Sequence, residues 1–199
     1  DERRRFAQVS HEYLIEQVQY QSDSITSGTA KNIQLNFNHP VKELIWQVSN
    51  SLAEVALAAR PAGDESTLAC GMQIDSGKFN LKLNGHDRFA ARDFRYFTRT
   101  QVWQHHTGYG GTSEPDSVAV YSFALKPEEH QPSGTCNFSR IDNAQFVMEE
   151  ALTADCSNTA GIAGYAGNAN DTANTIHFYA VNYNVLCVMS GMGGLAYSN

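Results

Sequence analysis

Short runs in which apolar and polar residues alternate, separated by glycine, asparagine, serine and proline, recur along most of this chain. Residues 33–37 and 79–83 are the clearest runs, with every second side chain apolar. Because successive side chains of a strand point to opposite faces, this period predicts strands with one buried face. By similar patterns, further strands are predicted at residues 13–20, 41–48, 101–105, 118–125, 136–150, 176–189 and 195–198. The run at 136–150 is interrupted by the turn-like Asp142-Asn143.

The segments between these runs are rich in turn-forming residues and leave little room for helix. Long loops are expected at residues 50–77, 108–116 and 155–174. Residues 52–59 could form a helical turn or two, residues 87–97 are predicted to form a short helix, and the glycines in 190–194 predict a tight turn. This profile is typical of an all-β protein, an antiparallel eight-stranded jelly-roll sandwich with short helices in the connections.

Composition limits the partners of such a domain. The 199 residues are 42% hydrophobic, which is enough for one well-filled domain. The formal net charge of -7 makes the surface as a whole repel a phosphate backbone, so no direct contact with nucleic acid is expected. The basic run Arg3-Arg4-Arg5 follows two acidic residues, and a solvated terminus is favoured over a phosphate-binding arm.

Hydropathy and cysteine spacing bear on the compartment. The chain has no apolar stretch of about 20 residues and no leading signal segment, so we expect a soluble, cytosolic chain without membrane insertion. Cys70, Cys136, Cys156 and Cys187 stand too far apart for a zinc ribbon or a dense disulfide framework. Reduced thiols are expected, and Cys187, within an apolar run, is predicted to be a small core residue.

Residues able to carry out chemistry are present, but not in catalytic patterns. His105 and His106 are neighbours on a predicted strand, so their side chains should point to opposite faces and could not share one metal ion. Glu128-Glu129-His130 lies between two prolines in a predicted loop, which does not fix paired carboxylates across a cleft. His11-Glu12 lacks the second histidine of a zincin, and no G-x-S-x-G elbow occurs. We therefore predict no enzymatic activity, no metal and no cofactor.

Two N-x-S/T sequons occur, one at Asn137 inside a predicted strand and one at Asn170 in a predicted loop. A sugar would fit the second position better, because loops lie at the surface. Chance occurrence is favoured for both, since the chain carries no secretory signal.

Four stretches go beyond composition. They are FNHPVKELIW at 37–46, YSFALKPEEHQPSG at 121–134, TCNFSRIDN at 135–143, and NYNVL at 182–186 together with MSGMGGLAY at 189–197. With these motifs the chain resembles the C-terminal half of the major capsid protein of large nucleocytoplasmic DNA viruses, most similar to the algal-virus and iridovirus branch. The resemblance extends from about residue 12 to the end of the chain.

The resemblance implies a fold of two consecutive jelly rolls per chain, of which this chain would be the second. Residues 1–10 would be the inter-domain connection and residues 11–199 the C-terminal jelly-roll domain. Three double-domain chains would form a trimeric pseudo-hexagonal capsomer that contacts neighbouring capsomers and minor capsid proteins in an icosahedral virion assembled in the host cytoplasm. Members of the family can carry glycans on outward loops, and Asn168, Asn170 and Asn174 correspond to such positions.

Aromatic residues are favoured at the cores of protein interfaces, which makes four of them candidate interface anchors. These are Trp46, Trp103, Tyr96 and Phe97, with ordinary core packing as the alternative for each. The main rival function is a carbohydrate-binding, lectin-like jelly-roll module, because the same fold hosts sugar recognition. A cupin-type metal enzyme would need clustered histidines on inward-facing strands, a spacing that the seven histidines do not show convincingly.

Overall fold

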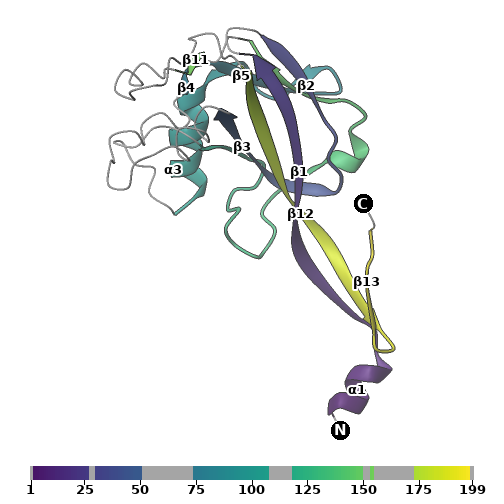
Figure 1. Ribbon diagram of the computed structural model, residues 1–199. Helices are drawn as coiled ribbons and strands as arrows, with labels where there is room; N and C mark the ends of the chain where they lie inside the picture. Colours follow the sequence, from purple (N-terminus) through teal and green to yellow (C-terminus); the bar gives the residue numbers. More distant parts are fainter. Residues whose placement is uncertain are drawn as a thin grey trace, which may run out of the picture.

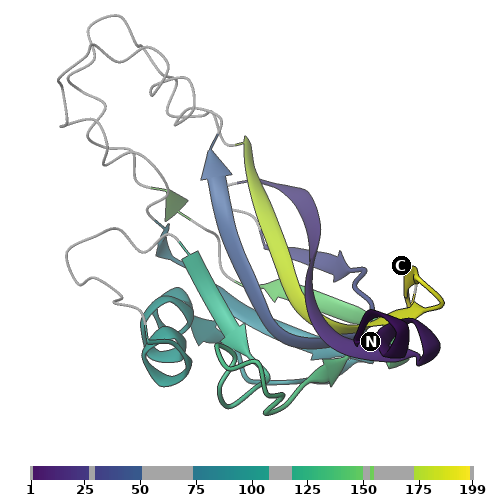
Figure 2. The same cartoon turned by 90° about the horizontal axis from the view of Figure 1, so that it is seen from below.

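Eight strands form two antiparallel sheets that pack face to face in this computed structural model, which describes residues 2–26, 30–50, 74–107, 118–149, 153–154 and 173–197 (Figures 1 and 2). The first sheet has the order β1 (His11–Thr26), β12 (Ala173–Met189), β3 (Pro40–Asn50) and β8 (Val118–Ser122). The second has the order β2 (Lys31–Leu35), β10 (Ala144–Met148), β5 (Lys78–Leu83) and β6 (His86–Asp87). Strands distant in sequence are therefore neighbours, as in a jelly roll, and the predicted fold class is confirmed.

Short strands extend these sheets. They are β9 (Cys136–Asn137) on β3, β7 (Arg92–Asp93) on β5 and β13 (Met192–Leu195) on β12, whereas β11 (Thr153–Ala154) and β4 (Ile74–Ser76) pair as a separate two-stranded sheet. Two residues, Ser190 and Gly191, join β12 to β13, and both have positive φ, at 51° and 78°. Two-residue hairpin loops of type I′ require that conformation. The predicted turn is therefore two residues long, and the last strand starts at Met192 instead of residue 195.

The core lies between the two sheets and is built from their inward side chains. Trp46 of β3 is at its centre, and its ring meets those of Phe97 and Phe146 edge to face with ring centres 5.0 Å apart. Phe146 continues the contact to Phe178 of β12 at 4.9 Å. Edge-to-face pairs at such distances add to the energy of simple burial. Inward residues of the two sheets, Trp46 and Phe178 from the first and Phe146 from the second, therefore meet in the core, as the predicted alternation requires.

The largest correction concerns residues 87–105. The predicted helix at 87–97 and the predicted strand at 101–105 are wrong, because residues 87–93 hold the end of β6, an irregular stretch and β7, and a helical segment runs from Phe94 to His105. That segment comprises the π-helix η2 (Tyr96–Thr100) and α3 (Gln101–His105). Its buried residues are Phe94, Phe97, Thr98 and Gln101. These buried residues are three or four positions apart, as on one face of a helix. The predicted strand covered only residues 101–105, which is too short a range to show that spacing.

Two smaller predictions also change. The predicted interruption at Asp142-Asn143 lies between β9 and β10, but it begins earlier, with the 3-10 turn η3 (Phe138–Arg140). There the Asn137 side chain accepts a hydrogen bond from the backbone N–H of Ser139. Strands β1 and β12 are longer than predicted, so Asn174 lies in β12 opposite Ile25 and Asn50 and not in a loop. The predicted features at 52–59, 108–116 and most of 155–174 lie outside the described residues.

Beyond the sandwich, the ends of β1 and β12 continue as a projecting arm (Figure 1). β12 pairs with β3 only as far as Asn182, whereas its pairing with β1 continues to Val188. We define the arm as residues 2–16 and 183–197. It contains β13 and, at its far end, the helix α1 (Glu2–Gln8), which has no buried residue. The boundary between connection and domain at residues 10 and 11 stays a prediction, although β1 does begin at His11.

Candidate interaction surface

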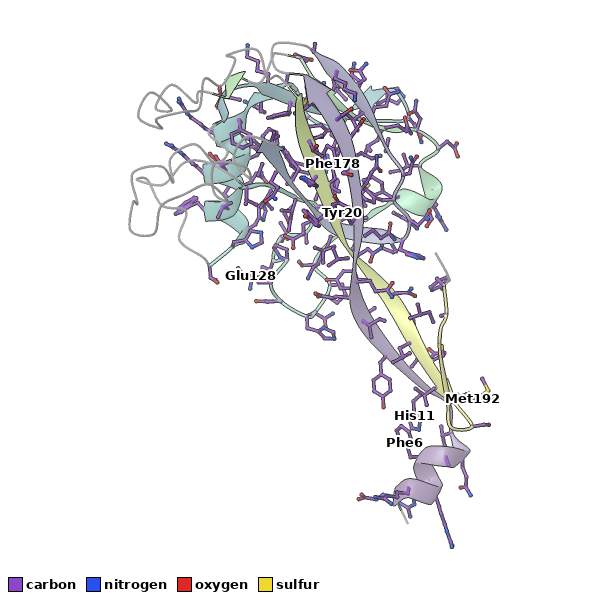
Figure 3. The ribbon with its side chains drawn as sticks, viewed as in Figure 1. Phe6, His11, Tyr20, Glu128, Phe178 and Met192 are labelled. Carbon is purple, nitrogen blue, oxygen red and sulfur yellow. The ribbon has the colours of Figure 1, made fainter. Side chains whose placement is uncertain are left out.

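The arm carries most of the exposed apolar side chains. Of the thirteen large hydrophobic residues that are exposed in the described part of the chain, eight lie on it. They are Phe6, Val9, Tyr13, Leu14, Met189, Met192, Leu195 and Tyr197. Figure 3 shows Phe6, His11 and Met192 together at the far end of the arm. Clustered exposed apolar residues of this kind mark a surface that meets a partner.

Hydrogen bonds and ring stacking hold the arm together. The buried amide of Asn184 in β12 donates to the Gln17 side chain at 3.0 Å and to the Tyr197 carbonyl at 2.8 Å, and so ties β1 to the residues after β13. At the far end, the Phe6 ring stacks on His11 with ring centres 3.9 Å apart. None of the described arm residues from 2 to 16 is buried, so this part of the arm has no apolar core of its own.

The apolar surface continues from the arm onto the outer face of the first sheet. Val18 and Tyr20 of β1 are 62% and 55% exposed, on the strand face opposite to the one that buries Ile25. The Tyr20 hydroxyl is 2.7 Å from Nδ1 of His177, and its ring lies 5.2 Å from that of Tyr179 on β12. These contacts fix the tyrosine in one orientation while most of its surface stays open, as suits a residue that packs against a partner.

A cluster of charged residues lies where the arm joins the sandwich. The pairing of β12 with β3 shifts between Val181 and Asn182, and this irregularity leaves Lys42 without an opposite residue. The Lys42 ammonium is buried, lies 2.7 Å from the Glu16 carboxylate and donates to the Pro127 carbonyl at 2.7 Å. Lys42 therefore links the root of the arm to the connection between β8 and β9 (residues 123–135).

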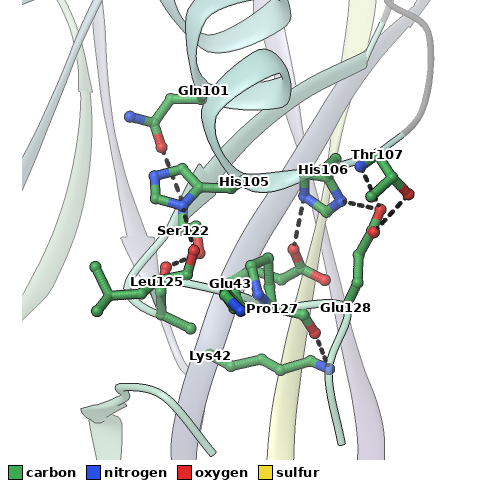
Figure 4. A network of polar contacts seen from close by, with 12 residues as sticks. Lys42, Glu43, Gln101, His105, His106, Thr107, Ser122, Leu125, Pro127 and Glu128 are labelled. Carbon is green, nitrogen blue, oxygen red and sulfur yellow. Dashed lines mark hydrogen bonds and ion pairs between the residues drawn. The ribbon is translucent and has the colours of Figure 1, made fainter.

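His106 lies in the same cluster, between two carboxylates (Figure 4). Its Nε2 is 3.1 Å from Oε2 of Glu43, and its Nδ1 is 3.3 Å from Oε1 of Glu128. The first contact has the geometry of a close ion pair and not of an aligned hydrogen bond. Glu128 also accepts bonds from the Thr107 hydroxyl at 2.7 Å and the Thr107 N–H at 3.0 Å.

The two carboxylates have opposite electrostatic environments. Loss of hydration on burial raises the pKa of Glu43, and this outweighs the lowering by His106 and Lys42. The hydrogen bonds from Thr107, first that of its hydroxyl, lower the pKa of the exposed Glu128. The two shifts are opposite: the pKa of Glu43 lies above its ordinary value and that of Glu128 lies below it.

The predicted strand geometry of His105 and His106 is wrong, because the two residues end α3 and follow it. Their rings still have separate partners, since Nδ1 of His105 lies 3.1 Å from the Leu125 carbonyl. Within the described residues, no group of three or more histidine, cysteine, aspartate or glutamate side chains is arranged to hold a metal ion.

The four predicted interface anchors divide into three environments. Trp46 and Phe97 are buried in the core, so packing is their role and they present no ring surface to a partner. Tyr96 is half-buried, and its hydroxyl accepts a hydrogen bond from the Gln101 amide at 2.8 Å. Trp103, on the outer side of α3, is 82% exposed. It is the anchor whose position suits a contact, which stays a prediction.

The predicted glycosylation positions are not brought together. Asn168 and Asn170 lie outside the described residues, and Asn174 lies near the start of β12. Glycosylation at all three stays a prediction. No helix in the described ranges is long and apolar enough to span a membrane.

Sequence reasoning missed both the arm and the charged cluster. One signal for the arm is present: Tyr13 and Leu14 are consecutive apolar residues, and a strand can bury only one of two neighbours against a single layer. The cluster has no such signal, because β1, β3, α3 and the β8–β9 connection contribute to it from distant parts of the sequence.

Nearly the whole chain is similar to known proteins of one family. Residues 2–194 match the family model described as large eukaryotic DNA virus major capsid protein. The full chain is 47% identical to the major capsid protein of Pyramimonas orientalis virus and 42% identical to that of Paramecium bursaria Chlorella virus 1. It covers 46% and 51% of these two proteins, so it spans about half the length of the curated relatives that it matches.

Solved structures give the same result. The chain aligns over its full length with 54% of a chain in the quasi-atomic model of the PBCV-1 virus capsid, with a TM-score of 0.72 and 39% identity. The Faustovirus major capsid protein matches 87% of the chain over 33% of its own length, with a TM-score of 0.61 and 14% identity. The second likeness supports the fold alone.

Proposed function

This chain belongs to the family of major capsid proteins of large eukaryotic DNA viruses, and we propose that it is a structural component of an icosahedral viral capsid. The observation that carries the proposal is the arm, whose exposed apolar side chains continue onto the outer face of the first sheet. A shell protein has to present such a surface to its neighbours, because apolar contact drives most protein association.

The partner that fits this surface first is the other half of a double jelly roll. The relatives are about twice as long as this chain, and the arm has a layer of apolar side chains without a second layer among the described residues. With both halves present, three units would form the trimeric pseudo-hexagonal capsomer. Capsomers would then contact one another and minor capsid proteins in the virion, after assembly in the host cytoplasm.

For a shell protein of this kind we expect no catalysis, no metal and no cofactor. We also expect no direct contact with nucleic acid and no insertion into a membrane. The carbohydrate-binding alternative gains no support from the family match or from the relatives, all of which point to a capsid protein.

Light scattering over a concentration series tests the proposal. The 199-residue chain alone should form weak, reversible oligomers, and co-expression with the N-terminal half of the Pyramimonas orientalis virus relative should give a stable trimer of the two-part unit. Stable trimers of the chain alone would contradict the part assigned to the other half. A chain that stays monomeric in both samples would contradict the assembly role itself.

Matched variants locate the surface. Replacing two exposed arm residues, Leu14→Ser with Met192→Ser, should weaken association with the other half. Leu125→Ser removes an apolar side chain that is as exposed as Met192 but lies outside the arm, and it should leave association unchanged. Equal effects of the two changes would show that the arm is not the contact surface.

A further inference from the structure

The two ring nitrogens of His106 both face a carboxylate oxygen, that of Glu43 at 3.1 Å and that of Glu128 at 3.3 Å. A neutral imidazole has one N–H and one bare nitrogen, whereas an imidazolium has two N–H groups. With both carboxylates charged, the neutral ring can therefore satisfy only one of them. Its bare nitrogen would face a negatively charged oxygen and repel it.

Water cannot easily relieve this conflict on the Glu43 side. Nε2 of His106 and Oε2 of Glu43 are both shielded from solvent, and Glu43 is fixed in the middle of β3 by its pairing with Ser122 and Val181. Glu128, by contrast, lies on the β8–β9 connection with a side chain that is 40% exposed. When repulsion arises, the exposed Glu128 side chain is the part that can move.

The remaining charges around the site do not remove the need for a proton. Lys42 of β3 lies 2.7 Å from Glu16 of β1, so these two form a neutral pair. Tyr183 of β12 lies over the same lysine, and Glu129 on the connection pairs with Lys126 at 3.0 Å. The other histidine, His105, contacts the Leu125 carbonyl at 3.1 Å (Figure 4). Glu43, Glu128 and His106 thus have a net charge of about -1 with the ring protonated and about -2 without.

We propose that His106 is a proton-operated clasp, which in its doubly protonated form joins Glu43 on the first sheet to Glu128 on the β8–β9 connection, and which opens on the Glu128 side when the ring loses a proton. The part that moves is the Glu128 side chain, because the Pro127 carbonyl beside it stays bound to the Lys42 ammonium at 2.7 Å. The start of the connection is held as well, where the backbone N–H groups of Phe123 and Ala124 both donate to the Lys42 carbonyl. All contacts of the clasp lie within one folded chain, so the proposal does not depend on the proposed function.

Opening has a local reporter. The backbone N–H of Thr107 donates to Oε1 of Glu128, the same oxygen that faces His106, so release of Glu128 exposes this amide to exchange with solvent. The experiment spans about pH 5 to pH 8, the range over which imidazoles in proteins generally gain or lose a proton. Protection of the Thr107 amide, corrected for the intrinsic exchange rate, should fall on the order of tenfold as the pH rises through it.

Amide hydrogen exchange followed by NMR on the 199-residue chain measures this directly. Glu128→Gln supplies an amide N–H that a bare ring nitrogen can accept, so its Thr107 protection should not depend on pH in this way. His106→Gln should behave likewise. His105→Gln, next to the site but without a carboxylate partner, should keep the pH dependence of the unmodified chain.

The result that overturns the proposal is equally specific. Constant Thr107 protection in the unmodified chain over this pH range would exclude the clasp, as would the same pH dependence in Glu128→Gln. The Glu128 side chain is 40% exposed, so Glu128→Gln should fold normally. This variant therefore decides the question even if His106→Gln fails to fold.

Discussion

β1 and β12 pass through two regions of the molecule whose surroundings differ. In the sandwich, β12 lies between β1 and β3, and its inward residues Ile176, Phe178 and Ala180 have no exposed surface. In the arm the same strands keep their register, yet Leu186 and Val188, which continue the same face of β12, are only partly buried. Alternation decides which face of a strand is apolar, but only a second layer buries that face. The difference teaches that hydrogen-bonded register and apolar burial are separate properties, and that the arm has the first without the second.

The largest expected effect is in the sandwich. Trp46→Ala removes the ring that contacts Phe79, Phe97 and Phe146 and should lower the free energy of unfolding by about 3–5 kcal/mol, through lost burial and a residual cavity. Denaturant unfolding measures it. Trp46→Phe should cost less, because it leaves a smaller cavity. A loss below about 1 kcal/mol for the alanine variant would contradict the central position of this ring.

The joint between the two regions should give an intermediate effect. Lys42→Met keeps the length of the side chain but leaves the Pro127 carbonyl and the Glu16 carboxylate without their partner, at a cost of about 1–3 kcal/mol in the same unfolding measurement. Glu16→Gln is the matched control and should cost less, since Glu16 is one-third exposed and its amide can still accept a bond. A larger loss for Glu16→Gln would place the main stabilising contact elsewhere.

A smaller effect should depend on pH. Burial raises the pKa of Glu43 in the folded chain, so its contribution to stability is present at low pH and is lost as the pH rises through the raised value. Relative to the unmodified chain, Glu43→Gln should therefore become more stable as the pH rises from about 4 to about 7. Unfolding curves at several pH values measure this difference. A relative loss of stability of the variant over that range would mean that the ionised carboxylate is favoured by its surroundings.

The smallest effect is expected in the arm. Met192→Ser changes a side chain that is 75% exposed and should alter the free energy of unfolding of the isolated chain by less than about 0.5 kcal/mol. Thermal unfolding of the two chains side by side measures it. A loss comparable to that of Trp46→Ala would show that the arm has a core of its own, and the contrast between the two regions would disappear.

The sequence by itself determined the class of fold and the apolar faces of the main strands. The predicted strands at 41–48 and 79–83 lie within or along β3 and β5, because alternation is local and can be recognised within a few residues. The four long motifs also determined the family, which the comparisons establish. These properties do not require knowledge of which strands are neighbours.

Only the tertiary structure decided which apolar residues are covered. Nothing in the sequence separates Trp46, at the centre of the core, from Trp103, on an exposed helix, because burial depends on whether a second layer is present. The helical segment from Phe94 to His105 was likewise decided by the core that its buried stripe contacts. Glu43, His106 and Glu128 come together only through the pairing of β3 with β8 and the path of the chain around them. Contacts between distant segments depend on topology, and alternation within one strand has no information about the strands beside it.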